Sequence, residues 1–188
     1  MKTKRSLVFL SLLLFTFCIG IVAFDDADAA QRNRKGSGIV SPLTDAEKVT
    51  MIYVREEEKL ARDVYMKMHE MWGAAIFSNI AVSEQRHMDA VLNLLVKYGV
   101  PDPVAGKGIG EFTDTFQGIY DGLIARGQTS LLEAFYVGQD IEIMDIDDLE
   151  EAMAGTDKVD LDTVYGNLLN GSLNHLDAFN AHIESLTQ

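Results

Sequence analysis

The residues best suited to chemistry are Glu84 and His87, which lie one helical turn apart in a helix predicted over residues 75–98. Every third or fourth residue of this helix forms a stripe that is otherwise apolar or aromatic, so the stripe should face a core. Burying a charged carboxylate is costly unless it is paired or bound to a metal. Glu-x-x-His on an inward helical face is also a ligand pair of two-metal carboxylate bundles. Because so short a motif arises often by chance, the hypothesis depends on partners from other helices.

The first partner lies in a helix predicted over residues 45–72. Its apolar stripe is interrupted by Glu58, and Glu57 beside it is a second choice. Thr44 and Glu47 form a capping box that predicts where this helix begins.

Two further helices are predicted, over residues 130–154 and 161–186. The stripe of the first carries Glu142 and Asp145, again one turn apart. The stripe of the second carries His175, but Ser172 stands where a second Glu-x-x-His would have its carboxylate. All four stripes are thus interrupted by groups that bind metals. The candidate ligands are Glu58, Glu84, His87, Glu142, Asp145 and His175.

The connections between these helices predict the fold. Short connections join the first pair and the last pair, whereas a glycine-rich segment with a short amphipathic piece over 114–125 separates the pairs. This order predicts an all-α antiparallel four-helix bundle with one long crossover. The glycines of residues 106–110 do not form a phosphate-binding loop, because the Gly-Lys-Ser/Thr ending and a preceding strand are absent.

The composition of the site favours particular metals. Oxygen ligands with a minority of imidazole suit iron or manganese, and zinc less well. Bridging carboxylates hold two metals roughly 3.5–4 Å apart. Asp63 and Asp177 are candidates, by helix position alone, for accepting a hydrogen bond from the outer nitrogen of each histidine. Off the stripe, a solvated acidic face is expected from Asp140, Asp147, Asp148, Glu150 and Glu151.

Composition excludes several classes of protein. The 188 residues carry a formal net charge of −13, and an acidic chain without clustered basic residues is not expected to bind nucleic acid. Cys18 is the single cysteine and lies in the apolar N-terminal run. If that run is removed, zinc-finger and thiol-redox sites are excluded.

The N-terminal residues resemble a secretory signal. A basic start, an apolar run over 6–24 and the small residues Ala27-Asp28-Ala29 predict cleavage after residue 29. We therefore expect a signal peptide over 1–29, a flexible linker over 30–42 and the bundle over 43–188. The protein is then exported to the periplasm or outside the cell, with no stable membrane association after cleavage. An uncleaved membrane anchor is the alternative.

These residues also carry a family resemblance. The helix with Glu58, Ala61, Arg62 and Tyr65 resembles the first ligand helix of rubrerythrin-type ferritin-like proteins, and Glu84-x-x-His87 resembles their second. The region 43–186 is similar to the uncharacterised DUF2202 family through residues 55–65, 83–87, 137–149 and 171–176. The resemblance implies a ferritin-like bundle that binds metal, and it implies no established reaction. Ser172 departs from the wider ferritin-like pattern, and Asp145 is a candidate to compensate.

Three functions remain open at this stage. The first is a two-iron or two-manganese protein that oxidises ferrous iron or reduces oxygen or peroxide, with Tyr65 as a neighbour that orients a ligand. The second is a binding protein that stores or senses metal at the same site without turnover. The third is a metal-free helical interaction module whose polar stripe sets helix register. A homodimer is also left open, and no internal rubredoxin-like Cys-x-x-Cys electron donor is present.

Overall fold

The computed structural model describes residues 41–188, and this part of the chain contains five helices and no strand. The predicted signal peptide and nearly all of the predicted linker lie outside the described residues. The all-helical prediction is confirmed for the part that is described. The helices are α1 (Asp45–Trp72), α2 (Ala75–Tyr98), α3 (Asp114–Gly127), α4 (Leu131–Ala154) and α5 (Val159–Thr187).

Local sequence signals explain where the helices begin and end. The Thr44 hydroxyl accepts a hydrogen bond from the backbone N–H of Glu47, and the Glu47 carboxylate accepts one from the backbone N–H of Thr44, which completes the predicted capping box. Gly73 and Gly99 end α1 and α2 at a φ of 67°, the left-handed conformation that glycine adopts without strain. A short turn at Gly73 joins α1 to α2, and a second short turn joins α4 to α5.

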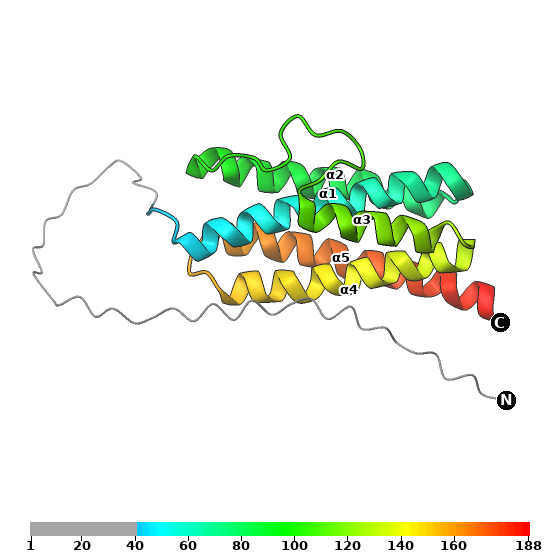
Figure 1. Cartoon of the computed structure of the whole chain (residues 1–188). Helices are drawn as coiled ribbons and strands as arrows, with labels where there is room; N and C mark the ends of the chain where they lie inside the picture. Colours follow the sequence, from blue (N-terminus) through cyan, green and yellow to red (C-terminus); the bar gives the residue numbers. More distant parts are fainter. Residues whose placement is uncertain (1–40) are drawn as a thin grey trace, which may run out of the picture. The chain divides into compact units, whose positions relative to one another are not determined.

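The four long helices form two hairpins that pack side by side (Figure 1). α1 pairs with α2 and α4 pairs with α5, while α1 also contacts α4 and α2 also contacts α5. Each of these neighbours runs antiparallel to the other (Figure 1). The shorter α3 belongs to the crossover and packs on α1 and α4. Within residues 41–188 no helix has the length and apolar character needed to cross a membrane.

The apolar core is divided into two clusters along the bundle. The first includes Leu60, Phe77, Phe135, Ile141 and Phe179, and the second includes Met51, Val91, Leu149 and Leu168. On every long helix the predicted ligands lie between the residues of these two clusters. The fold therefore encloses a polar layer between two apolar layers.

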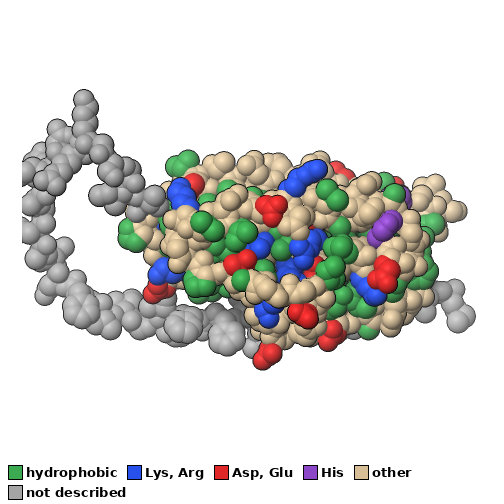
Figure 2. All heavy atoms as spheres, turned by 90° about the horizontal axis from the view of Figure 1, so that it is seen from above, with side chains coloured by type: hydrophobic (Ala, Val, Ile, Leu, Met, Phe, Trp, Pro, Cys, Tyr) green, Lys and Arg blue, Asp and Glu red, His purple; other side chains and the backbone are tan. Residues whose placement is uncertain are grey.

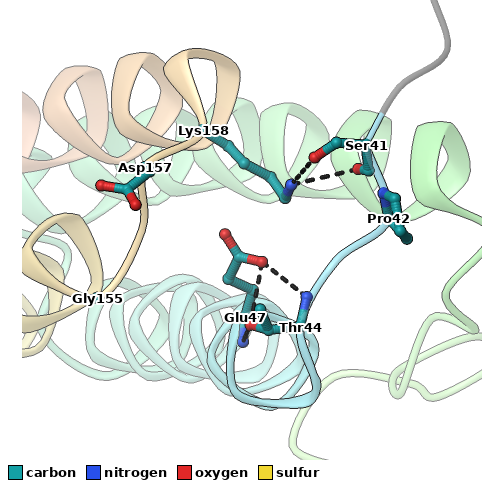
Figure 3. A pocket seen from close by; sticks show the side chains of 7 residues that line it. All are labelled: Ser41, Pro42, Thr44, Glu47, Gly155, Asp157 and Lys158. Atoms are coloured by element: carbon teal, nitrogen blue, oxygen red, sulfur yellow. Dashed lines mark hydrogen bonds between the residues drawn. The ribbon is translucent and has the colours of Figure 1, made fainter. Parts of the chain in front are cut away.

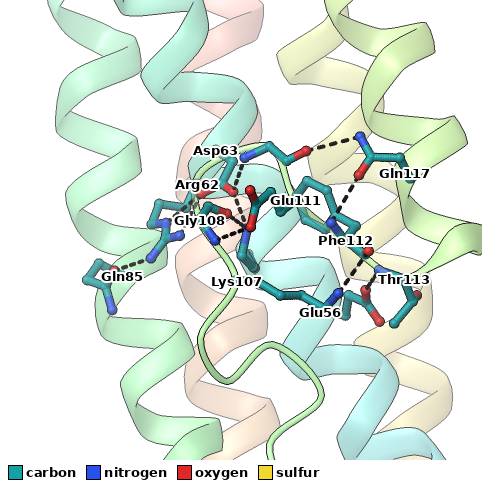
Figure 4. Close-up of polar contacts among 12 residues, drawn as sticks. Glu56, Arg62, Asp63, Gln85, Lys107, Gly108, Glu111, Phe112, Thr113 and Gln117 are labelled. Atoms are coloured by element: carbon teal, nitrogen blue, oxygen red, sulfur yellow. Dashed lines mark hydrogen bonds and ion pairs between the residues drawn. The ribbon is translucent and has the colours of Figure 1, made fainter.

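A buried ionic network fastens the crossover to the outer side of α1 (Figure 4). Asp63 is fully buried and accepts hydrogen bonds from Lys59, Arg62 and the backbone N–H of Gly110. Lys59 also donates to the carbonyl of Gly108 at 2.7 Å. Figure 2 shows basic side chains gathered near the middle of this face of an otherwise acidic protein. The network holds the crossover in place.

At one end of the bundle the start of α1 is tied to the turn between α4 and α5 (Figure 3). Lys158 donates to the Ser41 hydroxyl at 2.6 Å, and Thr156 donates to Glu47 at 2.7 Å. A hollow at this end is lined by Ser41, Pro42, Thr44, Glu47, Gly155, Asp157 and Lys158. Ser41, Thr44, Glu47 and Lys158 use their side chains in hydrogen bonds that cap α1 and join it to the turn, so we assign the hollow a structural role.

Candidate metal centre

The structure brings all six predicted ligands into the polar layer between the two apolar clusters. The four carboxylates are at most 4 % exposed, and the side chains of the two histidines are each 11 % exposed. Side chains from four different helices thus converge on one buried place. That these residues bind metal stays a prediction.

Glu58, Glu84 and His87 form one group, in which each residue offers an atom within 4.8 Å of the others. The His87 Nδ1 atom lies 2.8 Å from the Glu84 Oε2 atom and 3.2 Å from the Glu58 Oε2 atom. Both carboxylates therefore face the same ring nitrogen, and that nitrogen is the one placed to ligate a cation.

Glu84, Glu142 and His175 form a second group of the same kind. The His175 Nδ1 atom lies 2.9 Å from the Glu84 Oε1 atom and 3.5 Å from the Glu142 Oε2 atom. The two oxygens of Glu84 thus face two different histidines. A carboxylate placed in this way could be shared between two cations. The imidazole rings are nearly parallel, with centroids 5.7 Å apart.

Asp145 enters the layer from α4, and its partner is the serine that replaces the expected carboxylate of α5. The Ser172 hydroxyl donates to the Asp145 Oδ2 atom, and both side chains are buried. The opposite oxygen, Oδ1, has no hydrogen-bond partner. The structure therefore places a carboxylate from α4 beside the serine of α5, as compensation for the missing glutamate would require.

In the absence of metal, the carboxylates of the polar layer differ widely in pKa. Burial raises the pKa of Glu142 to about 8 and that of Asp145 to about 7, and the nearby charge of Glu84 adds to both shifts. Burial alone would raise the pKa of Glu84 too, but the two histidines lower it to about 2. Burial alone would lower the pKa of both histidines. The neighbouring carboxylates outweigh burial and raise the pKa of His87 to about 11 and that of His175 to about 9.

The residues fit a pair of cations because several buried polar atoms lack a partner. The structure gives no hydrogen-bond partner to the Glu58 Oε1, Glu84 Oε1 and His175 Nδ1 atoms. The last two lie 2.9 Å apart, so they are close but not aligned for a hydrogen bond. Buried polar groups without partners are rare in native proteins and call for a reason. Cations at the two groups would use these atoms.

Tyr65 lies immediately beside the second group. Its hydroxyl donates to the Glu142 Oε1 atom at 2.6 Å, and the ring is fully buried against Phe179 at a centroid distance of 5.3 Å. This contact leaves the Oε2 atom of Glu142 facing His175. The geometry is that of a tyrosine that orients a ligand, and this role also stays a prediction.

Gly171 is a site residue that the motif search missed. A Cβ atom at this position would lie 2.6 Å from both the Cε1 and Nε2 atoms of His87. Any larger residue at position 171 would therefore push the His87 ring away from its present position. The spacing of residues within α5 could not reveal this contact, because His87 belongs to a different helix, α2.

Two sequence-based expectations need correction. Asp63 is not placed to accept from a histidine, because the crossover network uses its carboxylate, and Asp177 is exposed. Asp148 does not belong to the solvated acidic face, because it is half-buried and accepts a hydrogen bond from Tyr53 at 3.0 Å. Glu57, the second choice to Glu58, is 1 % exposed, so both glutamates are buried.

Comparisons with known proteins define the family. A family model described as an uncharacterized protein domain, DUF2202, matches residues 47–188. The chain belongs to the DUF2202 family. This DUF2202 chain is 49 % identical over 139 residues to the uncharacterized protein MJ0754 of Methanocaldococcus jannaschii, a match that covers 73 % of this chain and 75 % of the relative.

The same relative supplies a solved structure. The crystal structure of the hypothetical protein MJ0754 from Methanococcus jannaschii superposes with a TM-score of 0.77 at 45 % identity, covering 80 % of this chain and 87 % of that one. The helical arrangement of this DUF2202 chain is thus shared with an experimental structure. Neither description names an activity.

Proposed function

We propose that this protein is an exported, ferritin-like metal protein whose bundle centre holds two cations, either iron or manganese. The proposal is supported most directly by the Glu84 carboxylate. One of its oxygens lies 2.8 Å from the His87 Nδ1 atom and the other 2.9 Å from the His175 Nδ1 atom. A carboxylate shared in this way between two nitrogen-containing groups is suited to bridge two cations.

The ligand set favours iron or manganese over zinc. Four carboxylates and two imidazoles provide mostly hard oxygen donors, and no cysteine lies within residues 41–188. Structural zinc sites are usually closed by four ligands and rich in sulfur or nitrogen. The six candidate groups exceed what one tetrahedral ion would use.

The chain's own residues would prepare the site for redox chemistry. Bound as a pair, iron or manganese would supply the electrons needed to reduce oxygen or peroxide. Tyr65 holds Glu142, and Ser172 holds Asp145, so two ligands are fixed before any cation binds. The apolar clusters on either side exclude bulk water. The histidine side chains remain 11 % exposed, which suits access by a small oxidant.

Metal content tests this proposal. Purified protein, incubated with ferrous iron, manganese and zinc and then desalted, should retain two iron or manganese ions per chain. Glu84→Gln should lose both, since it removes the charge that the two groups share. Glu150→Gln is the matched control, because Glu150 is an exposed glutamate of α4. Retention of two ions by Glu84→Gln would reject the bridging role.

Oxygen or peroxide consumption by the ferrous protein then tests turnover. Wild-type protein and Glu150→Gln should consume oxidant faster than Glu84→Gln. Equal rates in all three, with two ions bound in the wild type, would leave a storage or sensing protein in place of an enzyme.

A further inference from the structure

Glu57 is a buried carboxylate that the two groups of the metal centre do not use. It lies on α1 next to Glu58, is 1 % exposed, and neither of its oxygens has a hydrogen-bond partner. Its surroundings are acidic, with Asp145, Asp148 and Glu58 all contributing negative charge. Burial and this charge raise the pKa of Glu57 well above its usual value. A carboxylate so placed lacks any positive partner within the described structure.

Asp148 connects Glu57 with the surface. It lies close enough to Glu57 for its charge to raise the pKa of Glu57, and it is half-buried on α4, one turn beyond Asp145. The Tyr53 hydroxyl donates to the Asp148 Oδ2 atom at 3.0 Å, and the Tyr53 ring packs against Phe116 of α3 at a centroid distance of 5.1 Å. Asp148 is therefore held in place on the solvent side of Glu57.

On the inner side of Glu57, further oxygens without partners reach the metal centre. These are the Asp145 Oδ1 atom and the Glu58 Oε1 atom, both buried. Carboxylates thus continue from half-buried Asp148 through Glu57 to two ligands of the centre. They lie between α1 and α4, whereas both histidines come from α2 and α5.

We propose that Glu57 and Asp148 form an outer position that holds a partly hydrated divalent cation on its way to the two-cation centre. Buried Glu57, beside a second carboxylate, needs either a proton or a cation to neutralise it, and hard divalent cations bind with few carboxylates when water completes the shell. The tyrosine that holds Asp148 leaves its second oxygen available to such a cation. The position supplies only oxygen ligands, so it should bind more weakly than the centre.

This inference rests on the proposed two-cation centre, but an experiment can reject the outer position while leaving that centre in place. Manganese provides the probe, and its stoichiometry is measured by electron paramagnetic resonance of the free ion. Wild-type protein should bind two ions tightly and a third weakly. Glu57→Gln should keep the two tight ions and lose the third. Glu150→Gln, which removes the same charge from the exposed face of α4, should bind three.

The rate of loading gives a second readout. Cobalt uptake followed by its absorption should be about tenfold slower in Glu57→Gln than in the wild type, because the acidic side chain that attracts the cation is gone. Asp148→Asn, at a half-buried position, should slow uptake as well. It provides a second test in case Glu57→Gln does not fold. Glu150→Gln should load at the wild-type rate.

The outcomes separate the two proposals. Wild-type protein that binds no cation overturns the proposed function. Two ions in the wild type, with unchanged loading in Glu57→Gln, overturn only the outer position and leave a shared proton between Glu57 and Asp148. Loss of the two tight ions in Glu57→Gln also overturns it, because Glu57 would then be an ordinary ligand of the centre.

Discussion

Replacing Gly171 by alanine tests whether the position of the His87 ring controls metal binding. The new Cβ atom would lie 2.6 Å from the ring, whereas ordinary contacts begin near 3.4 Å. The ring must therefore retreat by about 0.8 Å, and metal–ligand distances tolerate only about 0.2 Å. Because His87 is the far end of a flexible side chain, the ring can move without disturbing the helices. The change should affect the metal rather than the fold.

We expect Gly171→Ala to weaken cobalt binding about 10- to 100-fold, the range seen when a ligand loses its orientation. The stability of the metal-free fold should change little, because the roughly 0.5–1 kcal/mol gained when alanine replaces glycine in a helix interior offsets the weakening of the His87 contacts with Glu58 and Glu84. Cobalt titration followed by absorption measures the first quantity and urea unfolding the second.

Gly166→Ala is the matched control on the same helix. Its Cβ atom would lie 3.5 Å from the Met153 methyl carbon, an ordinary contact, so cobalt affinity should stay at the wild-type value. Wild-type affinity in Gly171→Ala would refute the reasoning, since His87 could then not be a ligand in the position described. Equal loss in both variants would refute it too, because the effect would come from the helix.

Three further predictions concern pH, the serine of α5 and the crossover. Burial raises the pKa of Glu142 to about 8 and of Asp145 to about 7, so the metal-free folded protein binds protons more tightly than the unfolded chain. Its melting temperature in EDTA should fall as pH rises from about 5 through 8, and saturating manganese should abolish that fall; a rise in EDTA would contradict the account. Asp145→Ser should weaken metal binding measured by titration, and adding Ser172→Glu should restore part of it, whereas no recovery would show that the two positions do not substitute for each other. Lys59→Met should lower the free energy of unfolding in urea by about 3 kcal/mol, because it removes a cation from buried Asp63; a loss below about 1 kcal/mol, the value of an exposed pair, would show that the network is dispensable.

The helices could be predicted closely because their end signals are local. The predicted bounds of α1 and α2 agree with the structure, since a capping box and two glycines mark three of their ends. α5 begins at Val159, two residues before the prediction, and lacks a side-chain cap at its start. The end of α3, at Gly127, also lies two residues beyond the predicted end, so these two boundaries are the least accurate.

The site could be predicted only as far as one helix face allows. The apolar stripe selected Glu58 on α1, but α1 contacts α2, α3 and α4, so residues 54–61 are buried on every side. The stripe pattern assumes one buried face, and for that reason it misplaced Asp63 and ranked Glu57 only as a second choice to Glu58. The Gly171–His87 and Asp148–Tyr53 contacts join different helices, and no spacing within one helix reveals them.

The central claim is that two cations share the Glu84 carboxylate at the centre of the bundle. Anomalous diffraction from a crystal of manganese-loaded protein tests it most directly. The account predicts two strong peaks, one beside the Nδ1 atom of His87 and one beside that of His175, with Glu84 between them. A single peak, or peaks only at surface carboxylates, would contradict it.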